Sequence, residues 1–254
     1  SSAVPKRTEG AIMCIIIYKP AAMLLSAETI QTAFENNSHG AGFAYVDNGT
    51  VNIKKGFFTL AAFNEAYEPY KAHQAILHFR IRTHGNYEAE NCHPLEVTPN
   101  LVFAHNGVLY KMPTHKENSD TVQFNELILK NLIRIYGKRL VFDKHFIPIL
   151  DGYSMSKFVF LDHTGQFSII NEKDGEWNSK CWFSNDSYKP SKSYVYSEDA
   201  IYWENGVQKT RKKKKKYQQL PQLPAPSDYG QPNLPGMSNQ DSKMPWTLGD
   251  FLRP

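Results

Sequence analysis

The stretch MCIII, residues 13–17, constrains the fold more than any other part of this sequence. Consecutive β-branched residues are typical of strands, and the lack of polar interruption predicts that the strand over residues 14–18 is buried in a packed sheet. Cys14 begins this strand. A cysteine in such a place is either a small buried hydrophobe or, when a base lies beside its thiol, a nucleophile.

Strand-like and helix-like segments come in groups along the chain rather than in regular alternation. Ser26 is expected to cap a helix whose Ile30, Ala33 and Phe34 share one face. Residues 47–49, Asp-Asn-Gly, predict a hairpin turn between two strands. Further expected elements are a helix over 60–70, strands over 75–81 and 100–109, and a hairpin of 157–162 with 166–171. This order predicts an α+β fold built in layers.

The clearest helical pattern covers residues 120–136, and Gly137 is expected to end this helix. An apolar stripe along one face is expected to pack on the core. Its members are Phe124, Leu127, Ile128, Leu132 and Ile135.

The positive charge of the chain belongs to its C-terminal part. Residues 211–254 hold 8 of the 29 Lys and Arg and 3 of the 25 Asp and Glu, a net of +5, which leaves 21 − 22 = −1 for residues 1–210. The part from 211 is also rich in proline and polar residues, so we expect a flexible tail there. Its basic run at 211–216 is expected to bind polyanions weakly.

Three sparse cysteines argue against a disulfide framework and favour a reducing, cytoplasmic location. No metal site is expected, since the cysteines and histidines lack zinc spacing. No apolar run is long enough to cross a membrane. Residues 1–13 are interpreted as a leader or propeptide, or as a cloning remnant, and residues 14–210 as the folded domain.

Five residues have side chains or positions suited to amide chemistry. If the chain begins at Cys14, its own α-amine, with a pKa near 8, can serve as the base for the thiol. Asn106 and Gly107 can present two N–H donors to one oxygen, as an oxyanion hole requires. Arg80 is suited to a carboxylate. Asp120 is either an N-cap or first-turn acid of its helix or a partner for an ammonium group.

In their order, these motifs resemble the class II glutamine amidotransferase domain of the N-terminal-nucleophile hydrolases. The similarity rests on the Met-Cys strand followed by GAGF, RIRTHG, NCHP, AHNGVL and SDT, and it continues through a DGYSMSKFVF strand (151–160) and WFSNDSY (182–188). It covers about residues 14–190. The resemblance implies a four-layer αββα sandwich with the nucleophile at the start of an inner strand, and an activity that hydrolyses the side-chain amide of glutamine and releases ammonia without a cofactor.

The resemblance also implies roles for individual residues. Cys14 is the nucleophile, and the Asn106 side chain and Gly107 N–H form the oxyanion hole. Arg80 binds the α-carboxylate of glutamine and Asp120 binds its α-ammonium group. The remaining two expected site residues, Thr83 and His84, fall in the loop that lines the glutamine pocket.

The sequence departs from the family pattern at His39, where an acid is common, and at Ile81, where some members have tryptophan. Only about 20 residues and the basic tail follow the expected fold, so glutamine and a separate ammonia-accepting synthase or ligase are the expected partners. Two alternatives stay open: a different amide hydrolase on the same fold, and a non-catalytic binding or structural module in which residues 1–13 block Cys14.

Overall fold

The structure is a computed structural model that describes residues 14–81, 88–113, 115–190, 200–204 and 207–211. The chain divides into two units, Ser1–Pro190 and Ser191–Pro254. In the second unit, β11 (Ala200–Glu204) and β12 (Val207–Arg211) form an antiparallel hairpin. The predicted leader, 1–13, and nearly all of the predicted tail lie outside the described residues.

The first unit contains two antiparallel sheets. Six strands form the larger sheet in the order β3-β2-β4-β1-β10-β9, and four form the smaller in the order β5-β6-β7-β8. The strands of the larger sheet are β1 (Ile15–Lys19), β2 (Ala41–Asp47), β3 (Thr50–Phe57), β4 (Ala75–Phe79), β9 (Glu176–Asn178) and β10 (Cys181–Phe183). Those of the smaller sheet are β5 (Leu95–Thr98), β6 (Leu101–Asn106), β7 (Lys157–Asp162) and β8 (Phe167–Ile170).

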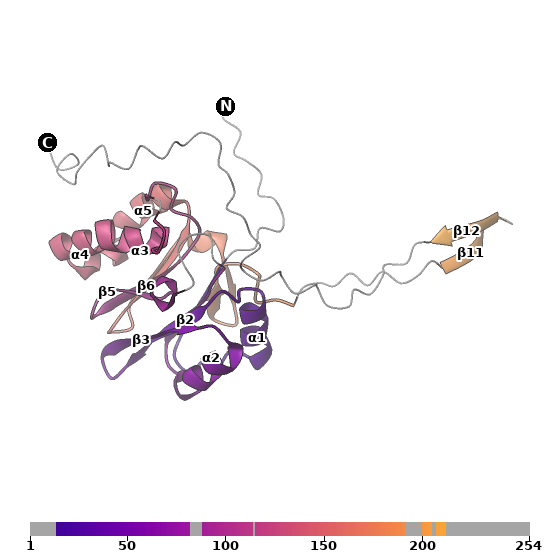
Figure 1. Cartoon of the computed structure of the whole chain (residues 1–254), viewed down its shortest axis with the longest axis horizontal. Helices are drawn as coiled ribbons and strands as arrows, with labels where there is room; N and C mark the ends of the chain where they lie inside the picture. Colours follow the sequence, from indigo (N-terminus) through magenta and orange to yellow (C-terminus); the bar gives the residue numbers. More distant parts are fainter. Residues whose placement is uncertain (1–13, 82–87, 114, 191–199, 205–206, 212–254) are drawn as a thin grey trace, which may run out of the picture. The chain divides into compact units, whose positions relative to one another are not determined.

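Helices cover the outer face of each sheet, as Figure 1 shows. On the larger sheet they are α1 (Ala27–Glu35) and α2 (Leu60–Tyr67), and on the smaller α3 (Asp120–Phe124), a π-helical turn (Asn125–Leu129), α4 (Lys130–Tyr136) and α5 (Phe146–Ser154). Three hydrophobic clusters fill the spaces between helices and sheet, between the two sheets, and between the second sheet and its helices. The prediction of α+β layers is therefore confirmed, with four layers in the order helix, sheet, sheet, helix.

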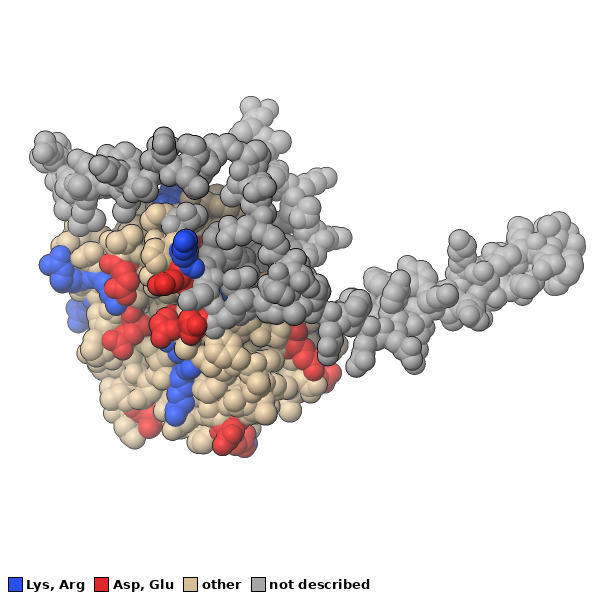
Figure 2. All heavy atoms as spheres, viewed as in Figure 1, with Lys and Arg blue, Asp and Glu red and all other residues tan. Residues whose placement is uncertain are grey.

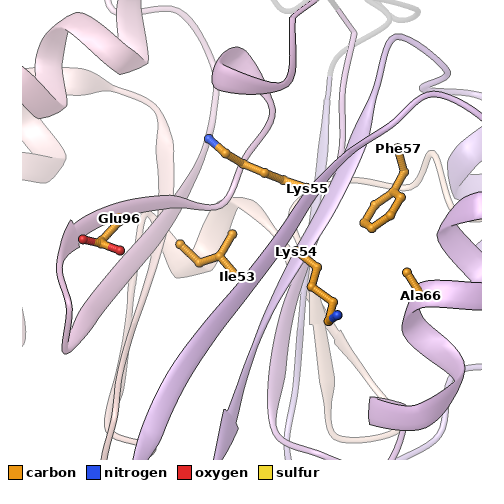
Figure 3. A pocket seen from close by; sticks show the side chains of 6 residues that line it. All are labelled: Ile53, Lys54, Lys55, Phe57, Ala66 and Glu96. Atoms are coloured by element: carbon orange, nitrogen blue, oxygen red, sulfur yellow. The ribbon is translucent and has the colours of Figure 1, made fainter.

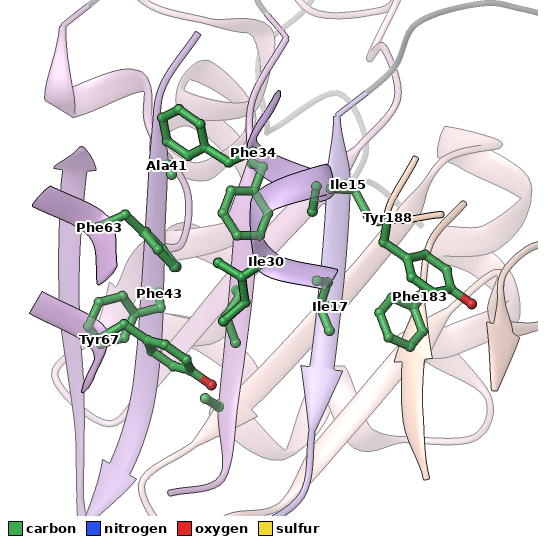
Figure 4. Close-up of a cluster of buried hydrophobic side chains, with 14 of the residues drawn as sticks. Ile15, Ile17, Ile30, Phe34, Ala41, Phe43, Phe63, Tyr67, Phe183 and Tyr188 are labelled. Atoms are coloured by element: carbon green, nitrogen blue, oxygen red, sulfur yellow. The ribbon is translucent and has the colours of Figure 1, made fainter. Parts of the chain in front are cut away.

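Strand β1 lies inside this sandwich, between β4 and β10. Ile15 and Ile17 pack in the cluster beneath α1 and α2 (Figure 4), whereas Ile16 and Tyr18 pack between the sheets. Because both faces of the strand are covered, its apolar residues run without interruption. The described members of all three clusters lie between Ile15 and Tyr188.

Two local predictions are confirmed by the backbone. The Ser26 hydroxyl accepts a hydrogen bond from the amide of Thr29, which caps α1 as expected. Asn48 and Gly49 have positive φ angles of 47° and 71° at the turn between β2 and β3. Such angles are typical of the two-residue turns that match the twist of a hairpin.

The expected helix over 120–136 forms, and its predicted apolar stripe is right at Phe124 and Ile128, which pack in the core, and wrong at Leu127 and Ile135. The π-helical turn at 125–129 adds one residue to a turn, so the core-facing positions after Phe124 move to Leu129 and Ile133, which are buried. Leu127 and Ile135, which the stripe placed in the core, are 41% and 47% exposed.

Two strand boundaries also differ from the predictions. The strand expected over 75–81 ends at Phe79, and the DGYSMSKFVF segment begins in the last turn of α5 and enters β7 only at Lys157. The backbone of Met155 between them takes the left-handed conformation, with φ of 50°, which ends the helix.

Candidate active site

Cys14 lies immediately before β1, where the chain enters the sandwich. Its Sγ is 3.2 Å from both the amide nitrogen and the carbonyl oxygen of Ile81, so the sulfur accepts one hydrogen bond and the thiol donates another. The carbonyl of Cys14 accepts a hydrogen bond of 2.8 Å from Asn185 Nδ2. The segments after β4 and after β10 therefore fix the position of this residue.

The surroundings of the Cys14 thiol favour its neutral form. Burial raises the pKa of the thiol to about 11, and the negative charge of Asp120 acts in the same direction. The Ile81 N–H and the positive charge of Arg80 lower the pKa without offsetting burial. Since the thiol is protonated at neutral pH, a reaction at sulfur requires a base that removes this proton.

A cavity of about 20 Å³ lies beside Cys14. A space of this size holds about one water molecule. Arg80, Gly107 and Asp120 line it together with Cys14. The structure thus brings together four residues that the sequence analysis placed in one site, from segments far apart in the chain.

The other predicted site residues have different outcomes. Asn106, the last residue of β6, directly precedes the cavity-lining Gly107 and is buried. Thr83 and His84 lie outside the described residues, so their predicted roles stay predictions.

The backbone at Gly107 requires glycine. Its φ angle is 149°, and a Cβ atom there would lie 2.2 Å from Ser156 Oγ. The preceding Asn106 directs its Nδ2 to Ser184 Oγ at 2.8 Å, whereas its Oδ1 is buried without a hydrogen-bond partner among the described residues. The turn therefore places Gly107 in the wall of the cavity and the Asn106 side chain against Ser184.

Arg80 follows β4 and is buried. Arg80 extends the pairing of β4 with β2 into the segment before β2. Its amide donates to the carbonyl of Gly40 at 2.8 Å, and its carbonyl accepts from the amide of His39 at 2.9 Å. This pairing gives His39 a backbone role in placing Arg80. The positive charge of Arg80 acts on the ionisation of Cys14, as described above.

Asp120 occupies the first turn of α3, and the N-cap is its neighbour Ser119. Asp120 Oδ2 accepts a hydrogen bond of 2.6 Å from the amide of Leu109, and Oδ1 accepts one of 2.8 Å from Thr121. The carboxylate therefore ties the turn after Gly107 to the start of α3. Asn91 supports the approach to this helix through hydrogen bonds of 2.6 Å to the carbonyl of Glu117 and from the amide of Ser119.

Three buried histidines also line the cavity, and the sequence analysis assigned none of them a role. They are His78 of β4, His93 before β5 and His105 of β6. The rings of His78 and His93 lie 4.4 Å apart. Burial lowers all three pKa values, to about 3 for His78, to about 4 for His105 and well below the usual range for His93. Each is thus neutral at pH 7.

The histidines left a weak signal in the sequence. Each lies within two residues of a residue that the sequence analysis singled out: His78 before Arg80, His93 after Cys92 and His105 before Asn106. Among the described residues, no group of histidine, cysteine or acidic side chains has the arrangement of a metal site. The neutral imidazoles form polar walls of the cavity.

A larger groove of about 620 Å³ follows the edge strand β3. Figure 3 shows Ile53 and Lys55 on one side of this strand with Glu96 of β5, and Phe57 with Ala66 of α2 on the other. Because its lining residues lie on opposite sides of one strand, the groove does not form an enclosed pocket that could hold a reacting amide. None of the residues predicted for the site lines it.

Acidic and basic side chains of the described residues are mixed on the face seen in Figure 2. This mixture agrees with the near-neutral charge counted for residues 1–210. No helix among the described residues is both long enough and apolar enough to cross a membrane. The predicted polyanion-binding run at 211–216 lies outside the described residues except for Arg211.

Comparisons with known proteins find a distant similarity to solved structures. No protein-family model matches the chain, and no curated protein matches it. Among solved structures, the chain is similar to the glutamine phosphoribosylpyrophosphate amidotransferase from B. subtilis, with 15% identity and a TM-score of 0.42. The match covers 67% of this chain and 41% of that enzyme, so the chain spans less than half the length of its relative.

Proposed function

We propose that the protein, when its chain begins at Cys14, hydrolyses the side-chain amide of glutamine and releases ammonia. The observation that supports this most is the convergence of the Cys14 thiol, Arg80, Gly107 and Asp120 on one small cavity. Glutamine has a carboxylate, an ammonium group and an amide, and these residues supply one complement to each. The four-layer architecture of residues 14–190 is consistent with the N-terminal-nucleophile hydrolase type, which we proposed for residues 14–210.

In the proposed reaction the α-amine of Cys14 takes the proton from its own thiol. The resulting thiolate attacks the side-chain amide carbon of glutamine, and the negative charge that develops on oxygen is stabilised by the Asn106 amide and the Gly107 N–H. The ammonium group of Cys14 then gives its proton to the leaving nitrogen. Ammonia departs and a γ-glutamyl thioester remains on sulfur.

Hydrolysis completes the cycle. The free amine accepts a proton from water, which attacks the thioester carbonyl, and glutamate leaves as the thiol is restored. Arg80 would hold the α-carboxylate and Asp120 the α-ammonium group, with Thr83 and His84 beside them.

The raised pKa of the Cys14 thiol explains why the reaction needs the α-amine as a base. A thiol with a pKa of about 11 is almost entirely protonated at pH 7.5, so little thiolate forms without an adjacent base. When Cys14 is joined to Met13, its nitrogen is an amide and is not basic. The proposal therefore predicts activity only after residues 1–13 are removed.

The test compares a chain expressed from Met13, whose initiator is removed, with the full chain. The first should release equal amounts of ammonia and glutamate from glutamine, and the second should be inert. Cys14→Ala should abolish the activity, whereas Cys181→Ala, which changes a buried cysteine in β10, should retain it. A chain that starts at Cys14 and leaves glutamine intact would refute the proposal.

The same assay separates the two alternatives. Hydrolysis of other acyl or γ-glutamyl amides, with glutamine left intact, would favour a different amide hydrolase on this fold. Glutamine binding without turnover by either chain would favour a non-catalytic binding module. We further propose that the ammonia acceptor is a separate synthase or ligase, which should raise the rate of glutamine hydrolysis when both proteins are mixed.

A further inference from the structure

Ser184 connects the two halves of the candidate site. It follows β10 in the larger sheet and is fully buried. Its Oγ accepts a hydrogen bond of 2.9 Å from the amide of Ile16 in β1 and lies 2.8 Å from the Asn106 side chain of the smaller sheet. Its own amide donates to the carbonyl of Ile16 at 3.0 Å. One hydroxyl thus joins the strand of Cys14 to the residue expected to bind the oxyanion.

The hydrogen bonds available to Ser184 Oγ favour the orientation of the Asn106 amide in which its oxygen faces the serine. With Nδ2 toward Ser184, the hydroxyl accepts two hydrogen bonds, and Asn106 Oδ1 is left buried without a partner among the described residues. Turning the amide by half a rotation lets the Ser184 hydroxyl donate to Oδ1. The two orientations have nearly the same shape, so the hydrogen bonds decide between them.

The turned orientation also suits the chemistry. An oxyanion needs N–H donors, and an amide oxygen directed at it would be repulsive. With Oδ1 held by Ser184, both hydrogens of Asn106 Nδ2 are directed away from the serine, as the proposed role in binding an oxyanion requires. The Gly107 N–H, which follows in the chain, supplies the second donor.

We propose that Ser184 is a positioning residue that holds the Asn106 amide with its oxygen toward the serine and its nitrogen toward the substrate oxygen. This inference rests on the proposed function for its kinetic consequences. Its structural part, the orientation of the amide, is independent of any activity. Since Ser184 also binds β1, it sets the distance between nucleophile and oxyanion donor, on which the rate depends steeply.

The kinetic experiment is a double-mutant cycle in the chain that begins at Cys14. Asn106→Ala should lower kcat for glutamine by about 10²–10³-fold. Ser184→Ala should lower kcat by roughly 10-fold or more with little change in KM, and should add nothing in the Asn106→Ala background. The matched control is Ser168→Ala, a buried serine in β8 whose hydroxyl donates to the carbonyl of Val141, and it should keep kcat unchanged.

Alkylation of Cys14 by iodoacetamide separates positioning from general damage to the fold. This reaction needs the thiolate but no oxyanion hole, so Ser184→Ala should change its rate by less than about 2-fold. If Ser184→Ala does not fold, Ser184→Cys keeps nearly the same size with a weaker donor, and should show a smaller loss with the same non-additivity. A loss that multiplies with that of Asn106→Ala, or an unchanged kcat, would overturn the inference.

The orientation itself can be observed in a crystal structure at better than about 1.2 Å resolution. Asn106 Oδ1 should face Ser184 Oγ. If it does and the protein is inert toward glutamine, the proposed function fails and the hydrogen-bond assignment stands. If Nδ2 faces the serine, the inference is wrong whatever the activity.

Discussion

Lowering the pH from 7 to 5 should destabilise the fold by about 6 kcal/mol, because three buried histidines cannot take up protons in the folded state. Burial is the main cause of the lowered pKa of each. Arg80 and His105 add to it at His78, and Lys157 adds to it at His105, where Asp120 acts in the opposite direction. At His93 the neighbouring imidazoles contribute, together with Arg80 and Lys55.

The sign and size of the stability change follow from the pKa of each histidine in the unfolded chain and in the folded protein. In the unfolded chain the imidazole pKa is about 6.5, and in the folded protein it is about 3 for His78 and about 4 for His105. Below pH 6.5 the unfolded state therefore binds protons that the folded state does not, so stability falls with pH down to the folded pKa values. At pH 5 the loss is about 2 kcal/mol for each histidine, which for three approaches the whole stability of many domains.

The assay is urea unfolding of the full chain, followed by tryptophan fluorescence at intervals between pH 5 and pH 7, above the range where most carboxyl groups titrate. The free energy of unfolding should change by about 4 kcal/mol per pH unit near pH 5. In His78→Leu this slope should decrease by about a third, whatever the stability of the variant at pH 7. The matched control His145→Asn, at an exposed position, should keep the slope of the original protein.

Two results would refute this reasoning. One is a total loss between pH 7 and pH 5 below about 2 kcal/mol, the value for a single histidine. The other is an unchanged slope in His78→Leu. Either would mean that protons or water reach these imidazoles in the folded protein.

Three further predictions concern the helix register, the turn beside the cavity and the thiol. Leu129→Ala should cost about 2–5 kcal/mol of folding free energy in urea unfolding, whereas Leu127→Ala should cost less than about 1, and equal losses would contradict the π-helical register. Gly107→Ala should destabilise the protein by about 1–3 kcal/mol in thermal unfolding. The control Gly152→Ala, in open space on α5, should stabilise it by about 0.5–1 kcal/mol. A neutral Gly107→Ala would mean that the turn relaxes. With residues 1–13 attached, iodoacetamide should modify Cys14 at pH 8 about 100-fold more slowly than a thiol of pKa 9. The rate should rise tenfold per pH unit. Modification at the rate of a free thiol would contradict the raised pKa.

Patterns of short range made the architecture predictable. The apolar run of β1, the Ser26 cap and the Asp-Asn-Gly turn each depend on neighbouring residues, and each appears in the structure as expected. The helical stripe was wrong at Leu127 and Ile135 for a different reason. Residues 127–129 are all apolar, so the sequence pattern accommodates the extra residue of a π-helical turn at several positions, and only packing against the smaller sheet selects one.

The site was predictable where a residue type suits one chemical task and not where several segments must meet. Cys14, Arg80, Gly107 and Asp120 came from such assignments, and they line one cavity. The three histidines were missed because a single imidazole in a strand is compatible with ordinary packing. Ser184 was missed because its contacts with Ile16 and Asn106 join positions 168 and 78 residues apart, a separation that local pattern cannot reveal.

The central position of β1 has a consequence for the order of events during synthesis. β1 can pair with β4 only after about residue 79 has left the ribosome, and with β10 only after about residue 183. Such distant pairings close slowly, because the chain between them must first be ordered. Until about residue 183 has been made, β1 therefore lacks its neighbour β10, and the thiol of the preceding Cys14 reaches its final, shielded environment only when nearly the whole sandwich has been made.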